Sequence, residues 1–168
     1  MCLSYTYITT LVGQLLLAGQ GDVVHYVGFP QDKIVRQLPS AWRRDDTVLP
    51  SCQRQLGEYF AGQRRTFDLV LNPQGTDFQK LVWQQLQSIA FGRVCSYQDL
   101  AIAIDRPKAA RAVGAANGKN PIAVIIPCHR VVGANGTLTG FSGGLDVKQQ
   151  LLELEGIIID GERQRALF

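Results

Sequence analysis

The sequence lacks the cysteine patterns that cross-link small domains or hold structural zinc. It contains four cysteines, Cys2, Cys52, Cys95 and Cys128, and none of them forms a C-x-x-C pair. The pattern indicates neither a disulfide framework nor a zinc finger. We therefore expect the cysteines to be thiols in a reducing cytoplasm.

Long apolar runs and a basic leader are also missing. The opening MCLSYTYITTLVGQLLLAGQ has no basic n-region, and Gly13 and Gln14 interrupt its apolar residues. We expect no secretory signal. No apolar run reaches the ~20 residues that a transmembrane helix needs, so we expect a cytoplasmic protein with no membrane partner.

Charge is modest in amount but uneven in placement. Of 168 residues, 18% are charged and 46% are hydrophobic, which is ordinary for a globular protein and argues against disorder. The net charge of +3 is compatible with an anionic partner without requiring one. In the second half, cationic residues are interleaved with small and apolar ones: Lys80, Arg93, Arg106, Lys108, Arg111, Lys119 and Arg130. This placement suits a surface that faces phosphates.

The hydrophobic pattern changes near residue 75. Residues 5–29 have the pattern of short strands: SYTYITT alternates in polarity, and the hairpin-like turn GQGD separates QLLLA from VVHYVGF, which predicts a small antiparallel sheet. We then expect a short helix at 33–38, a helix from an N-cap at Ser51 to Phe60, and a strand at 65–71. The expected fold class is α/β (α+β), with a sheet-and-helix domain over 1–75 and a mainly helical domain over 76–168.

The second half carries helix-capping signals. Thr76 with Gln79, and Ser96 with Asp99, have the spacing of capping boxes. The first of these helices has a predicted buried stripe of Phe78, Leu81, Val82, Leu86 and Ile89. A further helix is expected to start at Pro107, after a turn at DRP, and to end at Asn117-Gly118. The helix that opens at Ser96 and this one form a helix-turn-helix pattern.

The helix after Pro107 is unusually rich in alanine and glycine. Its backbone could approach a partner closely, with Arg111 projecting from that face. The same composition suits a helix packed against another helix, and this segment alone slightly favours packing.

The stretch NPIAVIIPCHRVVG places a thiol beside an imidazole and a guanidinium. A thiol in such surroundings can become a nucleophilic thiolate. The apolar IAVIIP predicts a buried strand, and Pro127 fixes the backbone before Cys128. Because adjacent side chains of an extended chain point to opposite faces, contact between Cys128 and His129 would need a tight turn or a bridging water.

A histidine base usually has its second ring nitrogen held by a carboxylate or carbonyl. The candidates are Asp146, Glu153, Glu155 and Asp160. Glu155 is the best placed for burial because it ends the helix DVKQQLLELEG near its apolar face. The alternative is an inert, buried cysteine beside a satisfied histidine. Arg130 and the glycine-rich GTLTGFSGG, which could close over a flat ligand, argue against that alternative.

The run NPIAVIIPCHRVVGANGTLTGFSGGLDVKQQLLELEG, with SYQDLA and PKAARAVGAANGKNP before it, resembles the O6-alkylguanine-DNA alkyltransferase family. The resemblance covers residues 75 to 157 in detail and the first half more loosely. It implies a protein that flips an alkylated guanine out of double-stranded DNA, with an alkylated thymine as a second candidate. The alkyl group then moves irreversibly to the protein's own cysteine, once per molecule. A monomer without a cofactor is expected.

The resemblance also implies roles for individual residues. Cys128 would be the nucleophile and alkyl acceptor, His129 would deprotonate it through a water, and Glu155 would orient the imidazole. Asn120 would brace the turn before the active-site segment.

The implied DNA contacts come from the helix-turn-helix and its surroundings. Arg111 would fill the space left by the flipped nucleotide, and Tyr97 would press on the neighbouring phosphate. Ala112, Lys108 and Arg130 complete the expected DNA-binding set.

The implied base pocket consists of Phe141, Ser142, Val131 and Gly143, with Ser142 and backbone groups binding the guanine edges. Phe141 stands where many members carry a tyrosine, so a hydroxyl that could help neutralise the leaving guanine is missing. Ala123, where some members carry proline, could leave room for larger alkyl groups.

Some members of the family hold zinc in the first domain. Cys2 and His25 are the only plausible ligands in that half of this sequence, too few for a closed tetrahedral site. We expect no metal.

Three other functions remain open. A module that binds damaged DNA without repairing it would not need Cys128. A cysteine hydrolase with a Cys-His-Glu triad would need an oxyanion hole, for which no motif is evident. A helix-turn-helix regulator would leave Pro-Cys-His-Arg without a task, and no dimer seam is evident.

Overall fold

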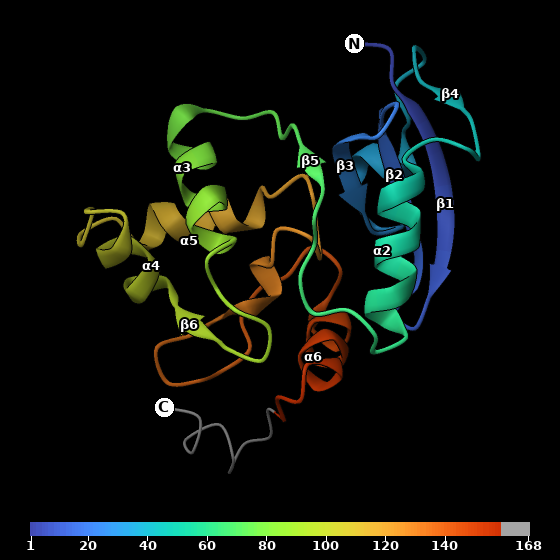
Figure 1. The fold of residues 1–168 in the computed structure, drawn as a ribbon. Coiled ribbons are helices and arrows are strands. Elements are labelled where there is room, and N and C mark those ends of the chain that lie inside the picture. Colours follow the sequence, from blue (N-terminus) through green and yellow to red (C-terminus); the bar gives the residue numbers. More distant parts are fainter. Residues whose placement is uncertain (159–168) are drawn as a thin grey trace. The chain divides into compact units, whose positions relative to one another are not determined.

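The computed structural model describes residues 1–158, which separate into two compact units (Figure 1). The first unit comprises residues 1–74 and 121–123, and the second comprises residues 75–120 and, of the described residues, 124–158. No helix in the described part of the chain is long and apolar enough to cross a membrane.

The sheet of the first unit has the strand order β4-β1-β2-β3-β5. Its centre, β1 (Ser4–Thr10), β2 (Gly13–Gln20) and β3 (Val23–Gly28), is the antiparallel meander that the sequence predicts. The flanking β4 (Arg43–Arg44) and β5 (Val70–Leu71) pair in parallel, so the sheet is mixed, and the strand expected over 65–71 shrinks to two residues. Strands this short carry too little alternation to be predicted.

The helices of the first unit are α1 (Lys33–Arg36) and α2 (Pro50–Phe60). The prediction that Ser51 caps α2 is wrong: Leu49 is the N-cap residue, and Pro50 occupies the first turn. Proline suits that position because the N–H it lacks would have no helical partner there. The Ser51 N–H donates instead to Asp22, at 3.0 Å.

The second unit contains α3 (Asp77–Leu86), α4 (Tyr97–Ala103), α5 (Ala110–Gly118) and α6 (Leu145–Leu154). Both predicted capping boxes are present, at the starts of α3 and α4. The predicted stripe of α3 is only partly right, because Leu81 is exposed and Trp83 is buried in its place. The Trp83 Nε1–H donates to Ala116 O at 2.8 Å and so ties α3 to α5.

The helix expected to start at Pro107 begins later, at Ala110. Asp105, which follows the C-cap residue of α4, has a left-handed φ of 58°, and the Arg106 N–H donates back to Ala101 O at 2.8 Å. The Ala109 N–H then donates to Arg106 O across a turn that contains Pro107. The chain needs these residues to reverse direction, so they cannot join the helix.

The apolar stretch IAVIIP is buried, as expected, but it is not a strand. Ile122 forms an isolated bridge with Val27, and Val124 has a left-handed φ of 71°. A β-branched residue rarely adopts this conformation, and here it interrupts the extended backbone. The segment therefore enters the Cys128 region through turns.

Candidate active site

Cys128 opens a 3-10 turn, Cys128–Arg130, which is followed by β7 (Val131–Val132). Pro127 before it has φ −82° and ψ 63°, and the Cys128 N–H donates to Ile126 O at 2.8 Å. These values define an inverse γ-turn. The backbone on both sides of Cys128 is therefore turned and not extended, and the side chains of Cys128 and His129 are both buried.

His129 is paired with Glu155 across 26 positions of sequence. Its Nε2 lies 2.6 Å from Glu155 Oε2, and both side chains are fully buried. Burial lowers the pKa of His129, against the opposing effect of Glu155, so the imidazole is neutral at pH 7. Because Nε2 faces a carboxylate, it carries the proton, and Nδ1 holds the lone pair. Nδ1 is buried and has no hydrogen-bond partner among the described residues, so it is the nitrogen that can accept a proton.

Glu155 is held in its ionised form by its neighbours. Burial by itself would raise its pKa, but hydrogen bonds and charge from His129 and Arg130 lower the pKa to about 2. The Gly92 N–H also donates to Oε1 at 3.2 Å. The expectation that Glu155 is buried is confirmed: it is the C-cap of α6, and Gly156 after it has φ 85°. Of the other candidates, Asp146 and Glu153 are exposed, and Asp160 lies outside the described residues.

Arg130 requires a correction, because it was expected to contact DNA. It is only 6% exposed. Its Nε and Nη2 donate to Glu155 at 2.8 and 3.1 Å, and its Nη1 donates to Ile89 O at 2.6 Å. A guanidinium occupied in this way is not available to a phosphate. Its charge instead stabilises the Glu155 carboxylate.

Two asparagines contact the backbone around Cys128. Asn120 Nδ2 donates to Ile126 O at 2.8 Å, which fits the bracing role expected of it. Asn117, which the sequence reasoning passed over as a helix end, is buried, and its Nδ2 lies 3.5 Å from Cys128 O. Both anchors belong to the end of α5 and the residues just after it.

The glycine-rich loop, defined here as residues 133–144, carries most of the expected base pocket. The Gly133 N–H donates to Thr137 O, and the Gly144 N–H donates to Phe141 O, at 2.8 and 2.9 Å. Phe141 is partly buried, Ser142 is exposed and Gly143 is buried. The fourth expected pocket residue, Val131, has no exposed side chain, so only its backbone is left for such a role.

Lys148 is a site residue that the sequence reasoning missed. Its side chain is fully buried, and its Nζ donates to Val131 O at 2.6 Å and to Thr139 O at 3.0 Å. A signal was present: Lys148, Leu151, Leu152 and Glu155 stand at i, i+3, i+4 and i+7, which is one face of a helix. The two charged residues on that stripe are the two that contact the site.

The other expected DNA-binding residues lie on or beside the helix-turn-helix. Arg111 and Ala112 on α5, and Lys108 before it, are exposed. Tyr97 at the start of α4 is partly buried, and its hydroxyl lies 2.7 Å from Thr139 Oγ1 of the glycine-rich loop. The sequence did not indicate this link between α4 and the loop.

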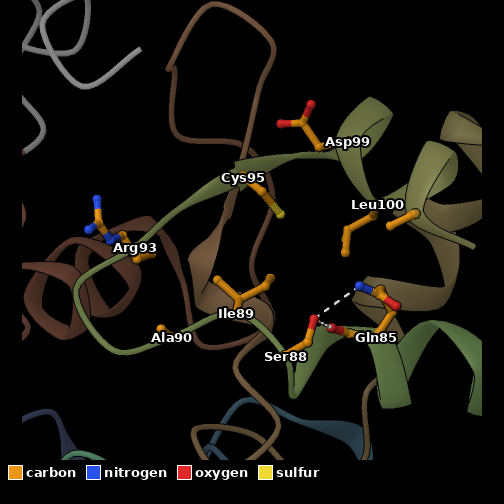
Figure 2. Close-up of a pocket in the computed structure, with 9 residues that line it drawn as sticks. Gln85, Ser88, Ile89, Ala90, Arg93, Cys95, Asp99 and Leu100 are labelled. Carbon is orange, nitrogen blue, oxygen red and sulfur yellow. Dashed lines mark hydrogen bonds between the residues drawn. The ribbon is translucent and has the colours of Figure 1, made fainter.

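A separate cavity of about 370 Å³ lies in the second unit beside α3 and α4 (Figure 2). It is lined by residues that include Gln85, Ile89, Arg93, Cys95 and Asp99. No member of the expected base pocket is among its lining residues, so this cavity is not the pocket that the sequence predicts. Burial raises the pKa of the Cys95 thiol to about 12, as it does for Cys52, so both stay protonated at pH 7.

The two residues considered as zinc ligands do not belong to a metal cluster. The Cys2 thiol donates to Ala41 O at 2.8 Å, and His25 is buried. Within the described part of the chain, no three His, Cys, Asp or Glu side chains gather as metal ligands.

Both halves of the chain match domains of one protein family. The DNA-binding domain of 6-O-methylguanine DNA methyltransferase matches residues 77–157, and the ribonuclease-like domain of the same family matches residues 3–73. A methylated-DNA–protein-cysteine methyltransferase of Methanosarcina acetivorans is 47% identical over 152 residues, which is 90% of this chain and 97% of that protein. A protein of the same name from Haemophilus influenzae is 42% identical over 92% of this chain and 87% of that protein.

Solved structures agree with these matches. A crystal structure of Mycobacterium tuberculosis OGT in complex with DNA has a TM-score of 0.85 at 45% identity, covering 90% of this chain and 92% of that one. An O6-methylguanine DNA methyltransferase from Methanococcus jannaschii has a TM-score of 0.64 at 26% identity, covering 93% and 96%. On these similarities, this chain belongs to the 6-O-methylguanine DNA methyltransferase family.

Proposed function

We propose that this protein repairs DNA by transferring an alkyl group to Cys128 from O6-alkylguanine, with O4-alkylthymine as a second candidate substrate. The observation that carries the proposal is the buried His129–Glu155 pair next to Cys128, with Nε2 on the carboxylate and Nδ1 available as a base. Family membership supports the same reaction, because the relatives are named methylated-DNA–protein-cysteine methyltransferases.

The proposed reaction needs no cofactor. His129 Nδ1 takes the thiol proton, directly or through a water, while Glu155 stabilises the imidazolium that forms. The Cys128 thiolate attacks the alkyl carbon, the carbon–oxygen bond breaks, and its electron pair stays with the guanine. The proton then passes to the guanine, so alkylguanine and thiol become guanine and thioether.

A thioether is stable to cellular reductants, so the reaction ends with the first transfer. The protein is therefore an enzyme of single turnover, a methylated-DNA–protein-cysteine methyltransferase.

The substrate is double-stranded DNA, and the reacting carbon is out of reach inside the base stack. We assign Arg111 to the space left by the flipped nucleotide, Tyr97 to the neighbouring phosphate, and Lys108 and Ala112 to the surrounding backbone. Exposure of Arg111, Ala112 and Lys108 supports these assignments. A side chain inserted from a helix with few bulky neighbours lowers the cost of unstacking.

The base pocket is proposed to form under the glycine-rich loop. Phe141 stacks on the base, and Ser142 and the backbone near Gly143 and Val131 bind its edges. The partial burial of Phe141 and the internal hydrogen bonds of the loop support a preformed pocket.

The cysteine hydrolase alternative is weakened by the geometry around Cys128. In acyl transfer, backbone N–H groups near the nucleophile often stabilise the oxyanion. Here the Cys128 N–H donates to Ile126 O, and the Arg130 N–H donates to Pro127 O. Alkyl transfer at a saturated carbon passes through no tetrahedral oxyanion, so it does not need an oxyanion hole beside the nucleophile.

We further propose that residues 1–75 form a supporting domain and that residues 76–168 form the DNA-binding and alkyl-acceptor domain of a cytoplasmic monomer. The grouping of residues supports the boundary, with residues 121–123 joining the first unit. Within residues 1–158 the four cysteines form no disulfide, which suits a reducing compartment.

The test is mass spectrometry of the protein after mixing with a duplex that contains one O6-methylguanine. We expect one added methyl group, confined to the Cys128 peptide and equal in amount to the repaired base. Binding to the lesion without modification would indicate a damage-binding module. A regenerated thiol with released product would indicate a hydrolase.

A further inference from the structure

We propose that the first unit contains a binding site for a small neutral molecule that carries an aromatic ring and a hydroxyl group. The site is a cavity of about 340 Å³ next to β3, and all of its lining residues belong to the first unit. Ligand pockets in proteins usually measure about 300–1,000 Å³, so this cavity suits a small ligand. None of its lining residues is assigned to alkyl transfer, so the inference goes beyond the proposed function.

A β-bulge places His25 in the lining of this cavity. The register of β2 with β3 shifts after Ala18, so that Gly19 lies opposite Val24 while Ala18 lies opposite Tyr26. His25 is the extra residue between them and has no partner on β2. In a regular strand His25 and Tyr26 would point to opposite faces of the sheet, yet here both line the cavity. Bulges often redirect a side chain in this way beside active sites.

His25 supplies a polar atom that the protein itself does not satisfy. The residue is only 6% exposed, and its Nδ1 has no hydrogen-bond partner in the described part of the chain. Burial lowers the pKa of His25, so the ring is neutral at pH 7, with one N–H and one lone pair. A buried polar group without a hydrogen bond is unfavourable. A hydroxyl can donate or accept, so it matches either nitrogen of the ring.

The walls of the cavity are aromatic and preformed. The ring centroids of Tyr26 and Trp42 lie 6.3 Å apart, with an interplanar angle of 57°, and Leu3 adds buried apolar surface. The Tyr26 hydroxyl donates to Asp32 at 3.1 Å, and its ring lies so close to Gly28 that no Cβ would fit there. A wall fixed in this way lowers the entropy cost of binding a flat ring.

The lining also determines the charge of the ligand. It is mainly apolar, and with His25 neutral none of its side chains is ionised at pH 7. The cavity beside α3 and α4 (Figure 2) differs, because Arg93 and Asp99 line it. None of the buried polar atoms that lack a partner within residues 1–158 belongs to the lining of that second cavity. The cavity next to β3 is therefore the one that indicates a neutral ligand with a hydrogen-bonding group.

The first experiment adds phenol to the full chain, without DNA, and follows the indole N–H signals by nuclear magnetic resonance. The chain has two tryptophans, and Trp42→Phe identifies the signal of Trp42. We expect phenol to shift this signal with a Kd on the order of 1 mM, as suits a ligand of few atoms. The signal of Trp83, which is buried in the second unit, should not move. Leu11→Ala, an exposed apolar change outside the cavity, should bind phenol like the wild type.

The second experiment tests the hydrogen bond to His25. Toluene has the shape of phenol with a methyl group in place of the hydroxyl. We expect the ratio of the Kd for toluene to the Kd for phenol to fall about fivefold in His25→Phe, the effect of one hydrogen bond. His25→Gln, which keeps a donor and an acceptor, should retain most of the wild-type ratio. Thermal unfolding shows whether each variant is folded.

A Trp42 signal that phenol leaves unmoved in the wild type would overturn the site, and this result needs no variant. An equal ratio in the wild type and a folded His25→Phe would overturn the role of His25. Both experiments are independent of alkyl transfer, so failure to repair O6-methylguanine would leave their results unchanged.

Discussion

Glu155 accepts hydrogen bonds from two separate segments of the chain, from Gly92 and from the adjacent His129 and Arg130. At the scale of single residues, it combines two tasks. In the proposed mechanism it orients His129 so that Nδ1 is the base, and it keeps Arg130 from being a buried, unpaired charge. Removing its charge should therefore affect both stability and chemistry.

We predict that Glu155→Gln lowers the free energy of unfolding by about 3–5 kcal/mol, because it breaks a buried ion pair and leaves Arg130 uncompensated. Methyl transfer should slow by about a hundredfold or more, because the imidazole loses its orientation and its counter-charge. Chemical denaturation and single-turnover kinetics measure the two effects. Glu153→Gln, an exposed position on the same helix, is the matched control and should change neither.

The same pair predicts how stability depends on pH. The pKa of Glu155 is lowered from 4.5 to about 2 in the folded protein. Its contribution to stability is therefore present above pH 4.5 and is lost as the pH falls towards 2. Thermal unfolding across this range should show a steeper loss in the wild type than in Glu155→Gln. Parallel curves would contradict the assignment.

The lowered pKa of His129 predicts how the rate of methyl transfer depends on pH. Burial lowers it below 6.5, so the neutral base persists into mildly acidic solution. We expect the rate of methyl transfer to show no loss from titration of His129 at pH 6.5 and to fall only at lower pH. A pH–rate profile in single-turnover conditions measures this. Half-maximal loss at or above pH 6.5 would argue against His129 as the base.

At the scale of elements, the turn between α4 and α5 has an unusual residue at its centre. Asp105 adopts a left-handed φ of 58°, and the Arg106 N–H donates to Ala101 O, which are the features of a Schellman motif. Glycine is the usual residue at this position because it has no Cβ to strain. The helix-turn-helix is formed despite Asp105, not because of it.

We predict that Asp105→Gly raises the free energy of unfolding by about 0.5–1 kcal/mol, since it relieves the left-handed conformation. Ser96→Ala, which removes the capping box of the preceding helix, should lower the free energy by about 1 kcal/mol. Urea denaturation measures the free energy of unfolding of the two variants. Opposite signs would show that the effect of Asp105→Gly comes from its backbone conformation, since a segment that tolerates no change would be destabilised by both. Destabilisation by Asp105→Gly would show that the Asp105 side chain contributes a contact.

At the scale of the whole molecule, binding to DNA depends on how cations are divided between surface and interior. Lys108 and Arg111 are exposed, whereas Arg130 and Lys148 are buried. Only the exposed cations can release counterions from DNA. The net charge alone therefore overstates the charge available to the nucleic acid.

We predict that Lys108→Gln weakens DNA binding at every sequence and reduces the slope of log affinity against log salt by about 0.9, the value for one phosphate contact. Fluorescence anisotropy over a range of salt concentrations measures the slope. Arg54→Gln, an exposed change on α2 of the first unit, is the control with equal charge loss. Equal slopes for wild type and Lys108→Gln would remove Lys108 from the interface.

Local physics made much of this protein predictable. Capping at Thr76 and Ser96 depends on residues three positions apart, so both helix starts were predicted correctly. The prediction of a strand at IAVIIP was wrong because an apolar segment can be buried without being extended. Here the left-handed backbone of Val124 interrupts the extended conformation. The Ser51 cap failed because Pro50 was already suited to the first turn.

The sequence by itself determined the family, the antiparallel meander and the helix-turn-helix, since each depends on a short pattern or a specific motif, and the same motif led to the proposal of Cys128 as the nucleophile. Only the tertiary structure decided the partners of the buried charges. Arg130 neutralises Glu155, and Lys148 holds Val131 and Thr139, because burial removes water and forces each ionised group to find hydrogen bonds within the protein. Those partners lie up to 41 positions away in the chain, as with Arg130 and Ile89, and no local pattern encodes them.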